Sequence, residues 1–251
     1  MRSFKLTIAY DGTDFFGWQV QPERPTIQGH LQAALREIAG QDIQVVGSGR
    51  TDAGVHALGQ VASCALPWRD AADRLGKALN SKLPETIVVT SCEDAAPGFH
   101  AIRDATGKRY RYQLQLNGNA DPFGYRYRWR LRGEIDVDRM AEAAKRFVGT
   151  HDFASFQATG SDRKTTVRDV RACDLALHDA SVPGSRFLTV EVEANGFLYN
   201  MVRNIVGTLV EVGRGKQSPE WIDQVMAACD RDVAGPTAPA HALFLLRVDY
   251  E

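Results

Sequence analysis

The strongest constraint on the fold is a change of hydrophobic period that recurs along the chain. Residues 4–10 alternate between apolar and polar or small side chains, which predicts a half-buried strand. Thr26 then precedes a segment whose apolar residues share one helical face, and Gly40 follows its end. Because segments of both kinds continue to the last residues, the sequence predicts helices packed on a sheet.

The expected elements form two halves. In the first, residues 1–105, we predict strands at 4–10, 42–46, 59–65 and 87–90, helices between Thr26 and Gly40 and at 68–81, and an extended segment at 99–103. In the second, residues 106–251, we predict strands at 108–116, 125–131, 165–177, 186–194 and 243–250, and helices at 138–148, 200–213 and 218–228. The expected class is α+β (mixed α/β), with two ferredoxin-like halves that share an extended, mostly antiparallel mixed sheet and carry helices packed on it.

The composition is that of an ordinary soluble globular protein, with 251 residues, 44% of them hydrophobic and 24% charged. A formal net charge of −1 means that any basic surface has to be local. The sequence has neither a run of about 18 apolar residues nor the apolar core of a signal peptide, so we expect a cytoplasmic protein with no membrane association. The four cysteines lie far apart, which favours free thiols and no metal site.

A glycine-rich stretch between two predicted strands is the first candidate for chemistry. Gly47, Gly49 and Gly54 surround Arg50 and Asp52. Glycine permits positive φ and close backbone approach, and functional residues often lie on loops held by a rigid scaffold. A structural alternative is that Asp52 only accepts a hydrogen bond that closes a turn.

A local excess of positive charge follows in the second half. Residues 103–132 contain eight basic and two acidic side chains, a local charge of +6. On the predicted strand 125–131 the arginines would share one face and the aromatic residues the other. This pattern fits a solvated sheet face, but it also fits a phosphate-binding face. The arginines concerned are Arg126, Arg128, Arg130 and Arg132.

Two further side chains stand out. Tyr110 lies between Arg109 and Arg111 on a predicted strand, where it is either a core tyrosine or a ring that stacks on a substrate and transfers a proton. Arg203 lies in the first turn of a predicted helix, where its charge opposes the helix dipole. It therefore either pairs with a buried carboxylate or extends to solvent.

Of the six histidines, only His56 and His100 lie near these segments. A structural role is the usual one for such histidines, and both are candidates for substrate contact. The glycines of the 47–54 stretch match neither a dinucleotide-binding nor a P-loop pattern, so a nucleotide cofactor is not indicated.

Seven stretches together resemble the tRNA pseudouridine synthase A (TruA) family over nearly the whole chain. The R-T-D-x-G-V-H-A run at 50–57 is highly specific, and the M-V-R helix at 201–207 is nearly so. One difference is Ala242, where the family usually has glycine. The matching stretches are 10–19, 49–56, 99–101, 108–112, 151–156, 201–207 and 237–240.

The resemblance implies isomerisation of uridine to pseudouridine at tRNA positions 38, 39 and 40, in the anticodon stem-loop. It also implies a homodimer with a central basic cleft, and no metal or organic cofactor. Asp52 would be the catalytic aspartate, Tyr110 would stack on the target base and act as general base, and Arg203 would pair with Asp52. Arg50 would help to extrude the base. The candidate substrate contacts are Arg50, Tyr110, His56, His100, Arg109, Arg111, Arg126 and Arg128.

Two other classes of function remain open on sequence grounds. A non-catalytic RNA-binding or RNA-folding protein would have the same basic surface without needing Asp52 or Arg203. A glycosidase or phosphotransferase could also use Asp52. The sequence shows neither a partner carboxylate at recognisable spacing nor a metal-ligand set for such an enzyme.

Overall fold

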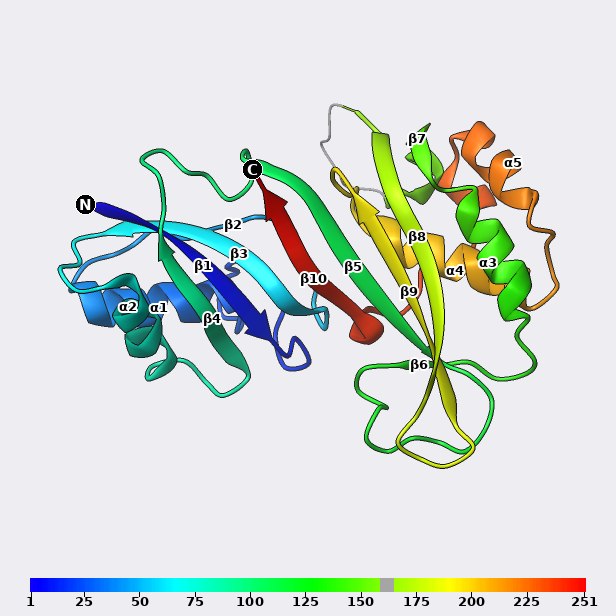
Figure 1. Cartoon of the computed structure of the whole chain (residues 1–251), viewed down its shortest axis with the longest axis horizontal. Helices are drawn as coiled ribbons and strands as arrows, with labels where there is room; N and C mark the ends of the chain where they lie inside the picture. Colours follow the sequence, from blue (N-terminus) through cyan, green and yellow to red (C-terminus); the bar gives the residue numbers. More distant parts are fainter. Residues whose placement is uncertain (159–164) are drawn as a thin grey trace. The chain divides into compact units, whose positions relative to one another are not determined.

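The computed structural model describes residues 1–158 and 165–251, which form two compact units (Figure 1). The first unit contains Met1–Thr106 together with Phe244–Glu251, and the second contains Gly107–Leu243. Both combine helices with a mixed sheet, so the predicted α+β class is confirmed. The last strand, β10 (Leu243–Tyr250), lies almost wholly in the first unit although it ends the sequence.

In the first unit, β1 (Arg2–Tyr10) lies between β4 (Ile87–Asp94) and β3 (His56–Leu66) and is antiparallel to both. The predicted alternation of β1 is confirmed, because Phe4, Leu6 and Ile8 are fully buried. The short β2 (Val46–Gly47) pairs antiparallel with β3, and β10 pairs with β3 in parallel. The helices are α1 (Ile27–Ala39) and α2 (Ala72–Asn80).

The predicted boundaries of α1 are confirmed by its caps. The Thr26 side chain accepts a hydrogen bond from the Gly29 N–H, and Gly40 adopts a left-handed conformation with φ of 68°. These local signals therefore fix where the helix begins and ends.

In the second unit the strand order is β5 (Ala105–Gln115), β9 (Arg186–Ala194), β8 (Val167–Asp179) and β7 (Gly149–Asp152). The two-residue β6 (Trp129–Arg130) pairs in parallel with β5. Figure 1 shows α3 and α4 beside β8 and β9. The helices are α3 (Val137–Lys145), α4 (Met201–Gly213) and α5 (Trp221–Ala228), with 3-10 turns at Ala154–Phe156, Arg231–Val233 and Ala240–Ala242. Ala242 needs no positive φ in its turn.

Several predicted elements are wrong. Residues 122–127 form turns, and of the predicted strand 125–131 only β6 exists. The cause is Asp121, whose side chain and carbonyl accept hydrogen bonds from the N–H groups of Phe123 and Gly124 and so turn the chain. Segment 99–103 contains a turn rather than an extended strand, the predicted strand 42–46 is reduced to β2, and the predicted helix 68–81 begins only at Ala72.

Candidate active site

The loop that carries Asp52 connects β2 to β3 in the first unit. Asp52 is half-buried, and its main-chain carbonyl accepts a hydrogen bond from Val55 N–H at 3.1 Å, which closes the turn. A main-chain hydrogen bond therefore closes this turn. Arg50, two residues earlier, is exposed.

Thr51, next to Asp52, is fixed from two sides. Its hydroxyl lies 2.8 Å from the Tyr10 hydroxyl, and its carbonyl accepts a hydrogen bond from Trp18 N–H at 3.0 Å. Gly17 has φ of +82°, and a Cβ there would lie 2.5 Å from the Thr51 carbonyl oxygen, so only glycine allows this approach. Burial raises the pKa of Tyr10 to about 12, so its hydroxyl is neutral at physiological pH.

Gln60 fixes the first part of the same loop. This fully buried amide on β3 donates to the Gly49 carbonyl at 2.9 Å, and its oxygen accepts from the Ser48 hydroxyl at 2.6 Å. Hydrogen bonds therefore hold the loop on both sides of Arg50, which is the preorganisation that a catalytic group requires. Tyr10, Thr51 and Gln60 were not predicted as site residues. Tyr10 and Thr51 lie in the matching stretches 10–19 and 49–56, and Gln60 is a polar residue in the largely apolar predicted strand 59–65.

The two candidate histidines both stabilise local structure. His56 is 1% exposed, and its Nδ1 accepts a hydrogen bond from Gly12 N–H at 3.0 Å. Its ring stacks on that of Phe244, with the ring centroids 4.6 Å apart. His100 is half-buried, and its Nδ1 accepts from Ile102 N–H at 3.2 Å. These contacts fit the structural role, and substrate contact by either histidine stays a prediction.

Tyr110 lies on β5 in the second unit, opposite Val192 of β9. It is 8% exposed, and its ring meets the edge of Phe197 at a centroid distance of 5.0 Å. Its neighbour Tyr112 is fully buried and donates to the Pro239 carbonyl at 2.7 Å. Tyr110 thus has a fixed ring orientation.

Arg203 is held at the start of α4 rather than extended into solvent. Its Nε donates to the Ala238 carbonyl at 2.7 Å, and its Nη1 donates to the Asn200 side chain at 2.9 Å. Asn200 precedes the helix in a left-handed conformation with φ of 60°. Asp52 belongs to the first unit and Arg203 and Tyr110 to the second, and their meeting stays a prediction.

A buried amide next to Arg203 ties α4 to the segment that Arg203 contacts. The oxygen of Asn204 accepts from the Thr237 hydroxyl at 2.7 Å and from Arg231 at 3.1 Å, and its nitrogen donates to the Phe156 carbonyl at 2.8 Å. Asn204 is completely buried, so each of these bonds matters for stability. Sequence reasoning missed it, although a polar residue within the apolar run 201–206 was a visible signal.

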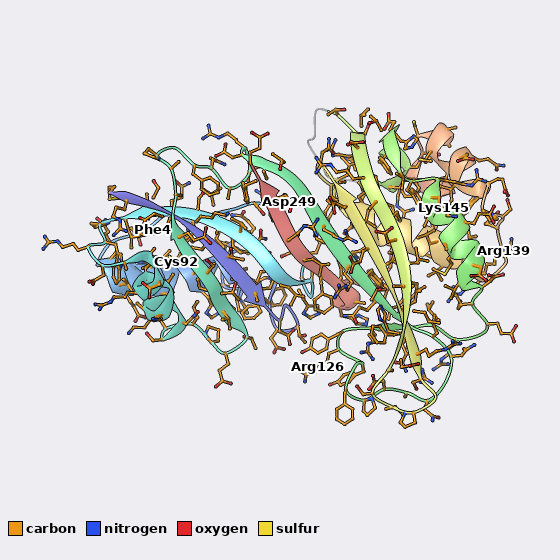
Figure 2. All side chains as sticks on the ribbon, viewed as in Figure 1. Phe4, Cys92, Arg126, Arg139, Lys145 and Asp249 are labelled. Atoms are coloured by element: carbon orange, nitrogen blue, oxygen red, sulfur yellow. The ribbon has the colours of Figure 1, made fainter. Side chains whose placement is uncertain are left out.

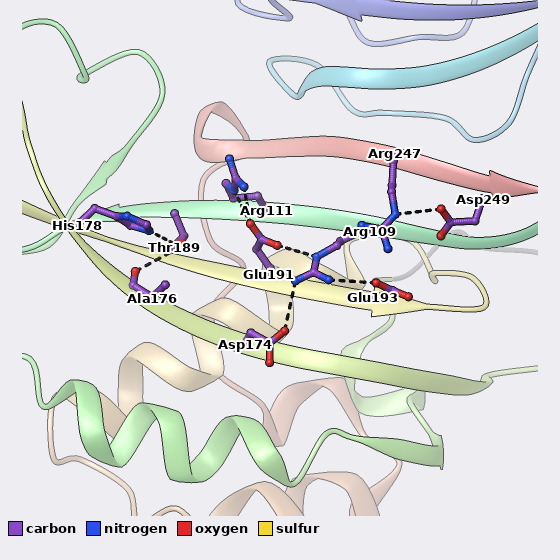
Figure 3. Close-up of polar contacts among 10 residues, drawn as sticks. All are labelled: Arg109, Arg111, Asp174, Ala176, His178, Thr189, Glu191, Glu193, Arg247 and Asp249. Atoms are coloured by element: carbon purple, nitrogen blue, oxygen red, sulfur yellow. Dashed lines mark hydrogen bonds and ion pairs between the residues drawn. The ribbon is translucent and has the colours of Figure 1, made fainter.

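Arg109 and Arg111 contact carboxylates of the neighbouring strands (Figure 3). Arg109 donates to Glu191 at 2.6 Å and Glu193 at 3.2 Å, and Arg111 donates to Glu191 at 2.7 Å. Burial raises the pKa of Glu191, but hydrogen bonds from Arg111 and Arg109 outweigh it and hold that pKa below its ordinary value. Much of the positive charge of β5 is therefore balanced by β9.

The remaining candidate arginines lie between β5 and β6. Arg128 forms an ion pair with the buried Asp121, and its guanidinium lies 3.9 Å from the centroid of the Phe187 ring. Arg126 is exposed, and its Nε donates to the Tyr125 hydroxyl at 3.0 Å. The predicted arginine face of a 125–131 strand is thus wrong, since Arg128 is drawn inward and Tyr125 outward.

Three further findings concern the cysteines, possible metal sites and possible membrane-spanning helices. All four cysteines are free thiols. Within residues 1–158 and 165–251, no group of three or more His, Cys, Asp or Glu side chains could hold a metal ion. No helix in those ranges is long and apolar enough to cross a bilayer.

Comparison with known proteins defines the class. The family model described as tRNA pseudouridine synthase matches residues 6–102 and 143–251. Proteins named tRNA pseudouridine synthase A from Brevibacillus brevis and Ruminiclostridium cellulolyticum are 46% and 41% identical to this chain over 250 residues, with all of both chains covered. The protein of that name from Moorella thermoacetica is 46% identical over 252 residues, again with full coverage of both.

An isomerase that forms pseudouridine is the class that these matches define. The chain belongs to the tRNA pseudouridine synthase family. The resemblance noted in the sequence is thereby confirmed, and so is the expectation that the chain is an enzyme.

Proposed function

We propose that this chain isomerises uridine to pseudouridine at positions 38, 39 and 40 of tRNA, in the anticodon stem-loop, with Asp52 as the catalytic aspartate. The observation that carries the proposal is the loop around Asp52, which Tyr10, Trp18 and Gln60 hold by hydrogen bonds in a chain of this family. A carboxylate can act as a nucleophile or stabilise positive charge on the sugar. Either role requires the ionised form.

The reaction exchanges one bond for another without change of oxidation state. The bond from N1 of uracil to C1′ of ribose breaks, a bond from C5 to C1′ forms, the C5 proton leaves, and N1 takes up a proton. We assign removal of the C5 proton to Tyr110, which also stacks on the base. No hydride donor or nucleotide cofactor is needed for this balance.

We further propose that Arg203 pairs with Asp52 and favours its ionised form. The bonds from Arg203 to Ala238 and Asn200 support this role, because they fix the guanidinium and leave little orientational freedom to lose on pairing. If the two residues act together, a double-mutant cycle on turnover with Asp52→Asn and Arg203→Gln gives strongly non-additive losses. Additive losses would contradict the pairing.

For substrate binding, we propose that Arg50 helps to extrude the target base, which costs about a few kcal/mol of stacking energy. Its exposed position beside Asp52 supports this role. His56, His100, Arg109, Arg111, Arg126 and Arg128 remain proposed contacts. For Arg109 and Arg111, RNA phosphates would have to compete with Glu191 and Glu193. We also propose that the chain works in the cytoplasm as a homodimer.

The decisive experiment uses Asp52→Asn, with Asp138→Asn on the exposed face of α3 as the matched control. In tRNA labelled with tritium at C5 of uridine, Asp52→Asn should abolish tritium release while tRNA affinity changes by no more than a few-fold. Sequencing of the product should place pseudouridine at positions 38–40. Tritium release by Asp52→Asn at the rate of the control would overturn the assignment. Tight tRNA binding by a wild-type chain without turnover would favour a non-catalytic RNA-binding protein.

A further inference from the structure

The loop of residues 117–128, between β5 and β6, is held firmly to the second unit. The Asn119 carbonyl accepts hydrogen bonds from the Gln115 side chain at 2.8 Å and from the Ser185 hydroxyl at 2.6 Å. Beneath the loop, Asp121 and Arg128 form an ion pair that is almost entirely buried. Since the partners of a buried ion pair resist separation, the loop has a defined shape.

Two aromatic side chains nevertheless point outward from this anchored loop. Phe123 is 77% exposed and Tyr125 is 61% exposed. Arg126, labelled in Figure 2, has its guanidinium carbon 5.8 Å from the centroid of the Tyr125 ring. Exposing large aromatic rings forgoes favourable burial, and such rings on a rigid support suit the recognition of a flat partner.

The charge around these rings indicates which flat partner fits. Residues 122–132 contain four arginines and no acidic residue. Arg128 is neutralised by Asp121, whereas Arg126, Arg130 and Arg132 are exposed, and Arg126 contacts the Tyr125 ring. A partner therefore needs both negative charge and planar faces. Unpaired RNA supplies phosphates for the arginines and bases for the rings.

We propose that the 117–128 loop binds an unpaired segment of the RNA substrate, with Tyr125 and Phe123 stacking on bases and Arg126 contacting a neighbouring phosphate. The inference rests on the proposed function, since it assumes an RNA substrate, and extends it to a loop of the second unit that carries none of the proposed catalytic residues. Stacking at this loop would add affinity without taking part in the chemical step.

The test measures tRNA binding and turnover separately for Phe123→Ala/Tyr125→Ala, Tyr125→Phe and Tyr125→Leu. The double variant should raise the dissociation constant and KM for tRNA about 10-fold or more, as the loss of base stacking predicts. Its kcat at saturating tRNA should stay within about two-fold of wild type. Tyr125→Phe keeps the planar ring and should bind like wild type, whereas Tyr125→Leu should bind more weakly despite its apolar side chain.

A fully paired RNA duplex and a control variant separate stacking from other effects. The double variant should bind the duplex as wild type does, and Arg74→Ala/Val88→Ala, which removes exposed side chains of the first unit, should leave tRNA binding unchanged. Unchanged tRNA affinity in the double variant, or equal affinity of Tyr125→Leu and wild type, would overturn the inference and instead favour a protein partner for this surface. Failure of the proposed function would appear differently, as absence of turnover in the wild-type chain.

Discussion

The Tyr10 and Thr51 hydroxyl groups lie 2.8 Å apart, and Thr51 belongs to the loop that carries Asp52. Tyr10 ends β1, and Thr51 precedes Asp52, so this hydrogen bond connects the rigid sheet to the proposed catalytic residue. We expect Tyr10→Phe to lower kcat with little change in KM, and to cost about 1 kcal/mol of folding free energy. Thr189→Val is the matched control, since it removes a largely buried hydroxyl of the second unit that donates to the Ala176 carbonyl at 3.2 Å. Equal kcat losses in both variants would indicate a general loss of stability rather than positioning.

The same tyrosine makes a prediction about alkaline stability. Burial raises the pKa of Tyr10 from 10.0 to about 12, so the folded chain retains this proton more tightly than the unfolded chain. Its contribution to stability is therefore complete below pH 10 and is lost as the pH rises toward 12. We expect the unfolding free energy of Tyr10→Phe, measured by urea titration, to fall less steeply than that of wild type over this range. If the unfolding free energies of the variant and of wild type fell in parallel between pH 10 and pH 12, the prediction would be wrong.

Gly207 of α4 faces the backbone of Pro236. A Cβ at Gly207 would lie 1.7 Å from the Pro236 carbonyl oxygen, so Gly207→Ala has to displace the segment that also supplies Ala238 to Arg203. We expect Gly207→Ala to lower the free energy of unfolding by roughly 3 kcal/mol or more. Gly76→Ala in α2 is the matched control, because its Cβ would lie 3.2 Å from the Cys92 Cβ and alanine favours helix by about 1 kcal/mol. Comparable urea midpoints for the two variants would refute this account.

Asn204 is expected to act as a positioning residue for Arg203. Asn204→Ala removes the buried partner of the Phe156 carbonyl and of the Thr237 hydroxyl. We expect this variant to lower the free energy of unfolding by about 2–3 kcal/mol. We also expect a larger fold-change in kcat than in KM. Asn204→Asp keeps the acceptor oxygen and should recover part of the kcat. If kcat fell only in proportion to the loss of stability, and Asn204→Asp recovered none of it, Asn204 would not be a positioning residue.

Glu191 neutralises part of the positive charge of β5, the charge that we propose to contact RNA. In Glu191→Gln the hydrogen bonds to Arg109 and Arg111 lose their ionic component, so both arginines can contact phosphate more readily. We expect tRNA affinity to rise a few-fold and its salt dependence to steepen. Glu142→Gln on α3 changes the same net charge at an exposed site and serves as the control. Identical effects of both variants would mean that net charge alone is responsible.

Local sequence signals predicted much of the secondary structure. The bounds of β9 and β10 agree with their predicted ranges, and Thr26 and Gly40 cap α1 as expected. They succeeded because alternation and capping depend on residues close together in the chain. The predicted 125–131 strand failed because Asp121 turns the chain by accepting hydrogen bonds from Phe123 and Gly124 and also pairs with Arg128, and these contacts outweighed strand propensity.

The sequence by itself therefore determined most of the strand and helix pattern and the family, and it predicts that the chemistry depends on Asp52, Tyr110 and Arg203. Only the tertiary structure decided which groups hold these residues in place. Tyr10 and Gln60 make hydrogen bonds to the Asp52 loop, and Ala238 accepts a hydrogen bond from Arg203 next to the buried Asn204. The pairing of Glu191 with Arg109 and Arg111 was likewise visible only in the structure. The reason is physical. Hydrogen bonds and ion pairs between residues distant in sequence leave no period or spacing in the chain, because they arise only when folding brings the strands and loops together.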